Sequence, residues 1–174
     1  YGEERKARAI ARAIGRVRGD MEISRTLELA DIVSQTIGQP AGLQKIHPAT
    51  RTFQALRIYV NDELGELVRG LAAAENMLGD GGRLAVVTFH SLEDRIAKKF
   101  LAHRTGRAGR PSRHMPEMHP PAPSFTELTR KGTKATEDEI SHNPRSRSAR
   151  LRAARRTGAP AFALDDVLFK APAD

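Results

Sequence analysis

Apolar residues in the first part of the chain recur every three or four positions, as they do in amphipathic helices. The first such helix is predicted over residues 3–18, with buried positions at Ala7, Ile10, Ile14 and Val17. Basic side chains occupy its other faces, and they fit either a solvated surface or a surface that faces nucleic acid. A second helix is predicted to begin at a cap on Ser24 or Thr26 and to end at Gly38, with Pro40 beyond it.

Two further helical patterns follow a loop that ends near Pro48. Pro48 suits the first turn of a helix, and the buried stripe of that helix is predicted at Phe53, Leu56 and Val60. A second face of the same helix carries Arg51, Gln54 and Arg57, because spacings of three bring side chains together on neighbouring turns. The next helical pattern runs from about Asp62 to Leu78, and the pattern leaves open whether Asn61 separates the two.

A short apolar run at residues 83–89 follows the glycine-rich stretch 79–82, and it lacks the three-and-four spacing of the helices before it. It is apolar on both alternating faces, which predicts a β-strand covered on both sides. A helix that reaches about His103 is predicted after it. Helix, turn, buried strand and helix in this order are typical of an α/β layered sheet.

The last third of the chain is less regular. Residues 104–124 are rich in Pro, Gly and Arg without periodicity, which predicts a flexible loop. Residues 125–131 alternate like a strand, and Thr136 with Glu139 forms a capping box that opens a short helix. Residues 143–156 contain six arginines and no acidic residue, and they fit either an edge strand or a helix.

Composition narrows the class of partner. The 174 residues carry 29 Lys and Arg against 21 Asp and Glu, a net charge of +8, which favours a polyanion. The chain has two Tyr, six Phe and no Trp, so phosphate contacts are expected to dominate over base stacking. It has no Cys, which fits a cytoplasmic protein, and no apolar run of the roughly 20 residues that span a membrane.

The stretch "VVTFHSLEDR" at 86–95 contains the side chains of a hydrolase. Ser91 and Asp94 match a helix-capping pattern, and a nucleophilic serine at such a turn would be flanked by glycines rather than by His90 and Leu92. His90 lies at the carboxyl end of the predicted strand, where open α/β sheets build ligand sites. It is predicted either to line a site or to close the end of the strand.

Other candidate chemistry is weaker. The glycines at 79–82 leave a helix and enter a strand, the reverse of a phosphate-binding loop, so a turn is predicted. The six histidines show no pair four residues apart on a helix and no accompanying Cys, so no metal site is predicted. Residues 143–150 fit either a disordered basic tail or a phosphate-binding segment, because Arg forks match phosphate oxygens.

Four blocks in order carry a resemblance to a known family: "YGEER" at the start, "KIHPATRTFQALRIYVNDEL" at 45–64, "GGRLAVVTFHSLEDR" at 81–95 and "NPRSRSARLR" at 143–152. Together they resemble the bacterial small-subunit ribosomal RNA methyltransferase H family, also called MraW. The resemblance implies transfer of a methyl group from S-adenosylmethionine to the exocyclic N4 of a cytidine in the decoding region of 16S rRNA.

The resemblance also implies a fold: the carboxyl-terminal part of a Rossmann-like class I methyltransferase sheet, with part of a helical insertion. Residues 1–44 resemble the insertion, which recognises the RNA target, and residues 45–174 resemble the Rossmann-like part. Residues 83–89 correspond to its fifth strand, and 125–131 with 147–155 to its closing antiparallel pair, which favours a strand for the Arg-rich segment.

The cofactor-binding residues of the family do not occur in these 174 residues. They comprise a Gly-Gly-His-Ser loop, an acidic residue for the ribose and an Asp-Leu-Gly-Val-Ser-Ser segment, all in an amino-terminal half. The chain, which begins at Tyr1, is therefore expected to be the carboxyl-terminal portion of such an enzyme. No cofactor-binding residue is assigned here.

The expected contacts with the RNA target lie around the mouth of the active site, with His90 as the candidate at its rim; they are Arg51, Gln54, Arg57, His90, Arg145 and Arg147. The expected partner is 16S rRNA in the small ribosomal subunit, and formation of a homodimer is left open. A different class remains as the alternative: a noncatalytic basic RNA-binding module.

Overall fold

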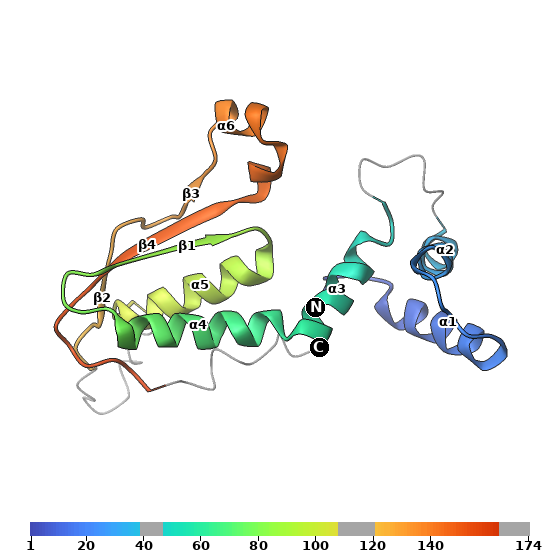
Figure 1. The fold of residues 1–174 in the computed structure, drawn as a ribbon, viewed down its shortest axis with the longest axis horizontal. Helices are drawn as coiled ribbons and strands as arrows, with labels where there is room; N and C mark the ends of the chain where they lie inside the picture. Colours follow the sequence, from blue (N-terminus) through green and yellow to red (C-terminus); the bar gives the residue numbers. More distant parts are fainter. Residues whose placement is uncertain (39–46, 108–120, 164–174) are drawn as a thin grey trace, which may run out of the picture. The chain divides into compact units, whose positions relative to one another are not determined.

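The computed structural model describes residues 1–38, 47–107 and 121–163, and the chain divides into two compact units, Tyr1–Glu63 and Leu64–Asp174 (Figure 1). Unit 1 is helical, and unit 2 combines helices with a β-sheet. No helix within the described ranges is long and apolar enough to cross a membrane.

Unit 1 contains α1 (Ala7–Asp20), α2 (Thr26–Ile37) and α3 (Thr50–Asn61). The core of this unit joins Ile10 of α1 to Ala30 and Val33 of α2, and Ala49 at the start of α3 belongs to the same cluster. The predicted buried face of α1 is confirmed at Ile10, which is buried, and at Ile14, which packs against the cluster, whereas Ala7 is exposed. Gly38 ends α2 in the left-handed conformation at φ 72°, as predicted.

Three local details of unit 1 differ from the prediction or complete it. Arg25 precedes the first turn of α2, and the Glu28 carboxylate accepts hydrogen bonds from the Ser24 and Arg25 amides at 3.0 and 3.1 Å, so the predicted cap on Ser24 or Thr26 is wrong. Pro48 lies in a turn ahead of α3 and not in its first turn. Asp62, left-handed at φ 48°, separates α3 from α4 and answers the question left open at Asn61.

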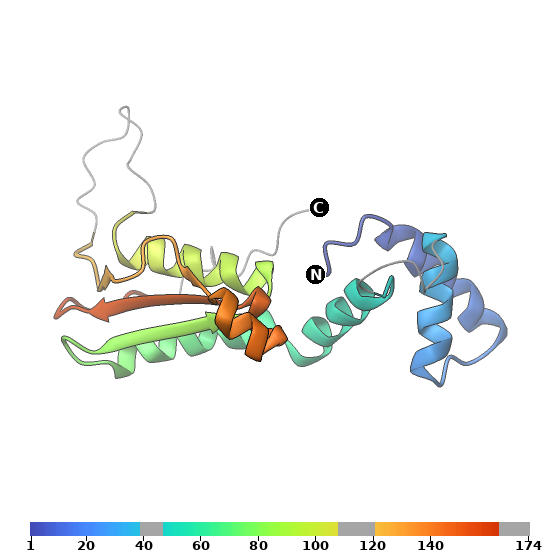
Figure 2. The ribbon, with the colours of Figure 1, turned by 90° about the horizontal axis from the view of Figure 1, so that it is seen from above.

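Unit 2 is built around a sheet in which every described pairing is antiparallel. Its elements are α4 (Glu63–Met77), β1 (Arg83–Thr88), α5 (Ser91–Arg104), β2 (Phe125–Glu127), β3 (Thr133–Lys134), α6 (Glu137–His142), the 3-10 helix η1 (Pro144–Ser148) and β4 (Arg150–Arg156). The strand order is β1-β4-β2, and β3 also pairs with β4. Figure 2 shows β4 alongside β1 over its whole length.

Both long helices of unit 2 lie on one face of this sheet (Figure 1). Val68 and Leu71 of α4 and Phe100 and Leu101 of α5 form one buried cluster with Phe125 and Ala154 of the sheet. Leu84 and Val86 of β1 pack against this cluster from the same face. Side chains at alternate positions of β1 and β4 therefore point toward the helices.

The other face of β1 is open in the described residues, and here the prediction of a strand covered on both sides is wrong. Val87 is 53% exposed and Phe89, just past the strand, is 55% exposed. The described helices cover only the face that carries Leu84 and Val86. The side chain of Val87 points to the other face, where no described element packs against it. The apolar run correctly predicted the strand, but it wrongly predicted that both faces of the strand are buried.

The Arg-rich segment is ordered and divides into two elements, η1 and β4. The prediction of a closing antiparallel pair is confirmed, because Phe125–Glu127 pairs with Ala154–Arg156. The predicted α/β fold class is confirmed as a whole. Residues 108–120 of the predicted loop lie outside the described residues, but its two ends are built into the fold, since Arg104 closes α5 and Ser124 is fully buried.

Candidate functional site

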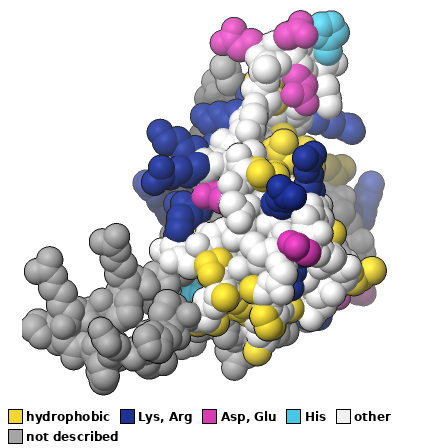
Figure 3. Space-filling model, turned by 90° about the vertical axis from the view of Figure 1, so that its left-hand side faces the viewer, with side chains coloured by type: hydrophobic (Ala, Val, Ile, Leu, Met, Phe, Trp, Pro, Cys, Tyr) yellow, Lys and Arg dark blue, Asp and Glu magenta, His cyan; other side chains and the backbone are white. Residues whose placement is uncertain are grey.

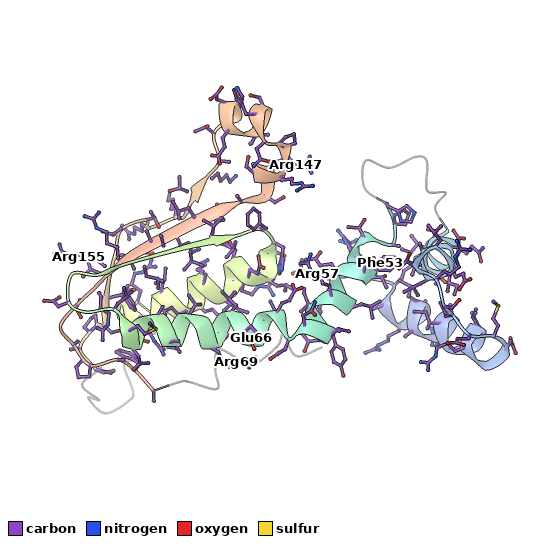
Figure 4. All side chains as sticks on the ribbon, in the orientation of Figure 1. Phe53, Arg57, Glu66, Arg69, Arg147 and Arg155 are labelled. Carbon is purple, nitrogen blue, oxygen red and sulfur yellow. The ribbon has the colours of Figure 1, made fainter. Side chains whose placement is uncertain are left out.

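The candidate site is the end of the sheet where β1 finishes and β4 begins. Thr88 and Arg150 are paired across the two strands, and the Thr88 hydroxyl donates to the Arg150 carbonyl at 3.3 Å. This pairing brings His90, two residues beyond Thr88, and η1, which directly precedes β4, to the same end of the sheet. Figure 4 shows Arg147 at this end and Arg155 at the opposite end of β4.

His90 is held as the cap of α5. Its Nδ1 accepts a hydrogen bond from the Glu93 amide at 3.4 Å, and its Nε2 lies 3.2 Å from Glu93 Oε1. The other carboxylate oxygen of Glu93 accepts from the Phe89 amide at 2.8 Å and from the His90 amide at 3.3 Å. The predicted Ser91 and Asp94 capping pair is therefore wrong, because the box is shifted by one residue to His90 and Glu93.

Asp94 is used for a different contact. Both of its carboxylate oxygens accept hydrogen bonds from Arg152 of β4, at 2.8 and 3.0 Å, in a two-pronged pair that ties α5 to the sheet. The hydrogen bonds from Arg152 and the positive charges of Arg152, Arg150 and Lys98 lower the pKa of Asp94, against the opposing effect of burial. The pair therefore stays ionised at neutral pH and fixes the start of α5 against β4.

Arg145 and Arg147 lie on η1 with their side chains exposed. The turn that presents them is fixed from within: Asn143 Oδ1 accepts from the Arg145 amide at 3.2 Å, and the buried Ser146 hydroxyl donates to the Asn143 carbonyl at 2.8 Å. Neither Arg145 nor Arg147 forms a side-chain hydrogen bond or ion pair with another residue of the described ranges. A rigid backbone thus holds two uncompensated guanidinium groups in solvent.

Charge in unit 2 is separated between neighbouring elements. The first turn of α6 carries three acidic residues, whereas η1 and β4 carry arginines. Figure 3 shows acidic side chains at the top of the view, where α6 lies, and Lys and Arg side chains gathered below them. An anion that approaches η1 is therefore repelled on one side and attracted on the other.

The other predicted contacts, Arg51, Gln54 and Arg57, are on α3 of unit 1, whereas His90 belongs to unit 2. Arg57 forms a two-pronged ion pair with Glu63, with nitrogen to oxygen distances of 2.7 and 3.1 Å. Arg51 is exposed and donates weakly to the Glu3 carbonyl at 3.5 Å, and Gln54 is half-buried. Figure 4 shows Arg57 on α3. Of these three side chains, Arg57 is the one already neutralised within the chain.

The sequence did not indicate the buried polar network at the opposite end of unit 2. Glu75 of α4 and Arg104 of α5, both fully buried, form an ion pair at 3.0 Å. Ser124 donates to the same carboxylate at 2.5 Å, and Arg156 donates to the carbonyls of Glu75 and Ser124, at 2.9 Å each. This network ties both helices to the end of β4. The sequence signal that could have suggested this network is the spacing of Arg150, Arg152 and Arg156, which places their side chains on one face of a strand.

Metal ligands are not grouped in the part of the chain that the structure describes: no three His, Asp or Glu side chains come together. The site consists of exposed guanidinium groups at the same end of the sheet as a capped helix start, an arrangement suited to binding an extended anion.

Comparison with known proteins identifies the class and then the family. A family model described as "MraW methylase family" matches residues 1–157, which include every helix and strand described above. The description of this model gives the class first, a family of methylases. The chain belongs to the MraW methylase family, as the four sequence blocks predicted.

Curated relatives agree with this assignment. A protein of Parvibaculum lavamentivorans named "Ribosomal RNA small subunit methyltransferase H" is 63% identical over 95% of this chain and 48% of its own length. Proteins of the same name from Nitrobacter hamburgensis and Azorhizobium caulinodans are 59% and 57% identical, over 95% and 99% of this chain. The chain spans about half the length of the curated relatives it matches.

Proposed function

We propose that the chain is part of an S-adenosylmethionine-dependent methyltransferase that modifies the exocyclic N4 of a cytidine in 16S rRNA. The family match, the names of the relatives and the net charge of +8 support this proposal. The activity would place the protein in the cytoplasm with the small ribosomal subunit as its partner. In this proposal residues 45–174 belong to the Rossmann-like domain and residues 1–44 to the RNA-recognising insertion.

The observation that carries the proposal is the position of Arg145 and Arg147. They are exposed, they make no side-chain hydrogen bond or ion pair with the described residues, and they lie at the end of the sheet that also presents His90. Arginine forks bind phosphate oxygens and orient an RNA strand without reading its bases. We assign to these two arginines the phosphates beside the target nucleotide.

The reaction requires more than binding. The lone pair of the cytosine amine is delocalised into the ring, so the amine must be aligned with the methyl group and must lose a proton. The base must also leave its stack to reach a cofactor. We therefore expect the bound strand to be held at its phosphates while one base turns toward the rim at His90.

His90 has a structural role in this arrangement. Its Nδ1 accepts a hydrogen bond from the Glu93 amide, and its Nε2 lies 3.2 Å from Glu93 Oε1, so both ring nitrogens lie next to the residue with which His90 caps α5. We propose a positioning role at the rim for His90.

We expect no site for S-adenosylmethionine at the connection from β1 to α5. The connection from β1 to α5 contains no glycine, and its amides at Phe89 and His90 already donate to Glu93. A ligand cannot approach this backbone closely, as it does at a glycine-rich loop. No step through the cofactor is assigned to these residues.

Titration with S-adenosylmethionine separates the proposal from its alternative, a noncatalytic RNA-binding module. By calorimetry we expect no binding to the 174-residue chain and micromolar binding to a longer chain that also contains an amino-terminal half. Methyl transfer to 16S rRNA by the longer chain is measured in parallel. Absence of both binding and transfer in the longer chain would leave the RNA-binding module as the function.

A salt series tests the polyanion partner. The logarithm of the RNA association constant should fall with the logarithm of salt concentration at a slope of about −0.7 for each phosphate contacted on a single strand. A slope near zero would contradict the assignment of phosphates to Arg145 and Arg147.

A further inference from the structure

The exposed face of α1 carries a straight row of arginines. Arg8, Arg12 and Arg16 are four residues apart, which places them on successive turns with a rise of about 6 Å between neighbours. All three are exposed, and they lie on the side of α1 away from Ile10, a buried residue of the core of unit 1. We call Arg8, Arg12 and Arg16 the arginine row.

The arginine row has no paired counter-charge among the described residues of unit 1. None of the three side chains forms a hydrogen bond or ion pair with residues in the described ranges, and α1 contains no acidic residue before Asp20. Like charges four residues apart destabilise a helix by about 0.2–0.5 kcal/mol for each pair. This cost, which an alternating pattern of Glu and Arg would avoid, is relieved when an anion lies along the row.

A strip of small residues runs beside the arginine row. Ala11, Gly15 and Gly19 are also four residues apart, and a Cβ atom added at either glycine would meet nothing within 4 Å. A glycine in a helix interior costs about 1 kcal/mol relative to alanine, and here no packing contact or positive φ requires it. The strip leaves the backbone of α1 accessible directly beside three guanidinium groups.

We propose that the arginine row binds the sugar-phosphate backbone of RNA, with the strip of small residues as the surface along which the strand lies. Three forks on one line fit a linear array of phosphates, and guanidinium groups bind phosphate oxygens in pairs. The strip has no large apolar side chain that could enter a lipid surface. The contact involves no base, so it adds affinity that does not depend on the RNA sequence.

This inference rests on the proposed function for the kind of nucleic acid, and it is tested by a charge-matched pair of variants. The first variant of the 174-residue chain carries Arg8→Gln, Arg12→Gln and Arg16→Gln. The control carries Arg18→Gln, Lys98→Gln and Lys99→Gln, three exposed cations outside the row. Both lose three positive charges, and circular dichroism checks that both keep their helices.

Binding is measured by fluorescence anisotropy with a 16S rRNA fragment and with an unrelated RNA of equal length. For the row variant we expect the salt slope to decrease by about 2, because about 0.7 is lost with each phosphate contact, and to do so equally for both RNAs. The control should change the slope by less than half as much. An unchanged slope in the row variant, or an equal change in the control, overturns the inference.

A third variant tests the strip without a change in charge. Gly15→Leu should raise the thermal stability of α1 and weaken RNA binding severalfold, because the side chain blocks the approach of the strand. Unchanged binding contradicts the role of the strip. Preference of the unaltered chain for the 16S fragment over the unrelated RNA reports on the proposed function separately, so the two can fail independently.

Discussion

Helix α1 and strand β4 use arginine in opposite ways. In α1 the guanidinium groups of Arg8, Arg12 and Arg16 are exposed and have no partner among the described residues. In β4 of unit 2, Arg152 and Arg156 are 5% and 7% exposed, and each is hydrogen-bonded to groups of other elements. The net charge of +8 therefore does not distinguish the arginines that stabilise the fold from the arginines that are available to a ligand.

This division follows from the period of each element. In a helix, residues four apart share one face, so three arginines can all be exposed opposite a buried stripe. In a strand, alternate residues point to opposite faces, so an Arg-rich strand packed against helices must bury some of its arginines. Burial is tolerated only because each buried guanidinium finds acceptors.

The largest effect is expected at the buried ion pair. Glu75→Gln leaves the Arg104 guanidinium buried without its counter-charge, and we expect the free energy of unfolding of unit 2 to fall by about 3–5 kcal/mol. Urea unfolding followed by circular dichroism measures the change.

The matched control is on the same helix. Glu66 and Arg69 of α4 form an exposed ion pair at 2.7 Å, visible in Figure 4. Glu66→Gln should change the free energy of unfolding by less than about 1 kcal/mol. Equal losses in the two variants would show that burial does not distinguish the pairs.

A smaller effect is expected at the pair between α5 and β4. Asp94→Asn removes one charge from the contact with Arg152, and we expect a loss of about 1–3 kcal/mol in unfolding free energy at pH 7. Because the pKa of Asp94 is lowered in the folded chain, its contribution is present above the unfolded pKa of about 3.9 and is lost as the pH falls through the folded pKa.

The comparison of unfolding midpoints between pH 7 and pH 3 tests this sign. The difference between the unaltered chain and Asp94→Asn should be constant down to about pH 5 and should shrink below pH 4. A difference that grows with acidity would mean that Asp94 is not stabilised as a carboxylate.

The smallest effect on stability is expected at η1. Replacing Arg145 and Arg147 with Ala should alter the free energy of unfolding by no more than about 0.5 kcal/mol, because both side chains are exposed, while RNA binding weakens. Ser146→Ala between them is the converse control: it removes a buried hydrogen bond, so stability falls by about 1 kcal/mol and RNA binding is retained. A large loss of stability in the double variant would make the two arginines structural.

Local pattern was sufficient for the elements and insufficient for contacts between them. The capping box at Thr136 was predicted because its donor and acceptor lie three residues apart, and Thr136 does accept from the Glu139 amide. The cap of α5 was misplaced because Asp94, the expected capping residue, is bound by Arg152, 58 residues away. A prediction of the helix start from local propensity alone cannot take account of Arg152, which is distant in the sequence.

The same reasoning applies to the strands and to the candidate site. An apolar run predicts burial of both faces of β1, but whether a second layer covers it depends on elements elsewhere in the protein. Arg57 was predicted on the same helix face as Arg51, yet its nearness to Glu63 across the left-handed residue Asp62 neutralises it. The placement of Arg145 and Arg147 at the same end of the sheet as His90 follows from the pairing of Thr88 with Arg150, which no local pattern contains.

The position of β4 also bears on how the protein is made. β1, β2 and β3 all pair with β4, which follows them in the chain, and the described residues contain no pairing among the first three. During synthesis the ribosome must therefore release Arg150, the first residue of β4, before any pairing of this sheet can form, whereas α1 and α2 are complete at residue 37. Unit 1 can therefore fold early. Until β4 is synthesised, the apolar sides of α4 and α5 in unit 2 remain uncovered, and during this interval the nascent chain is most exposed to aggregation and to chaperones.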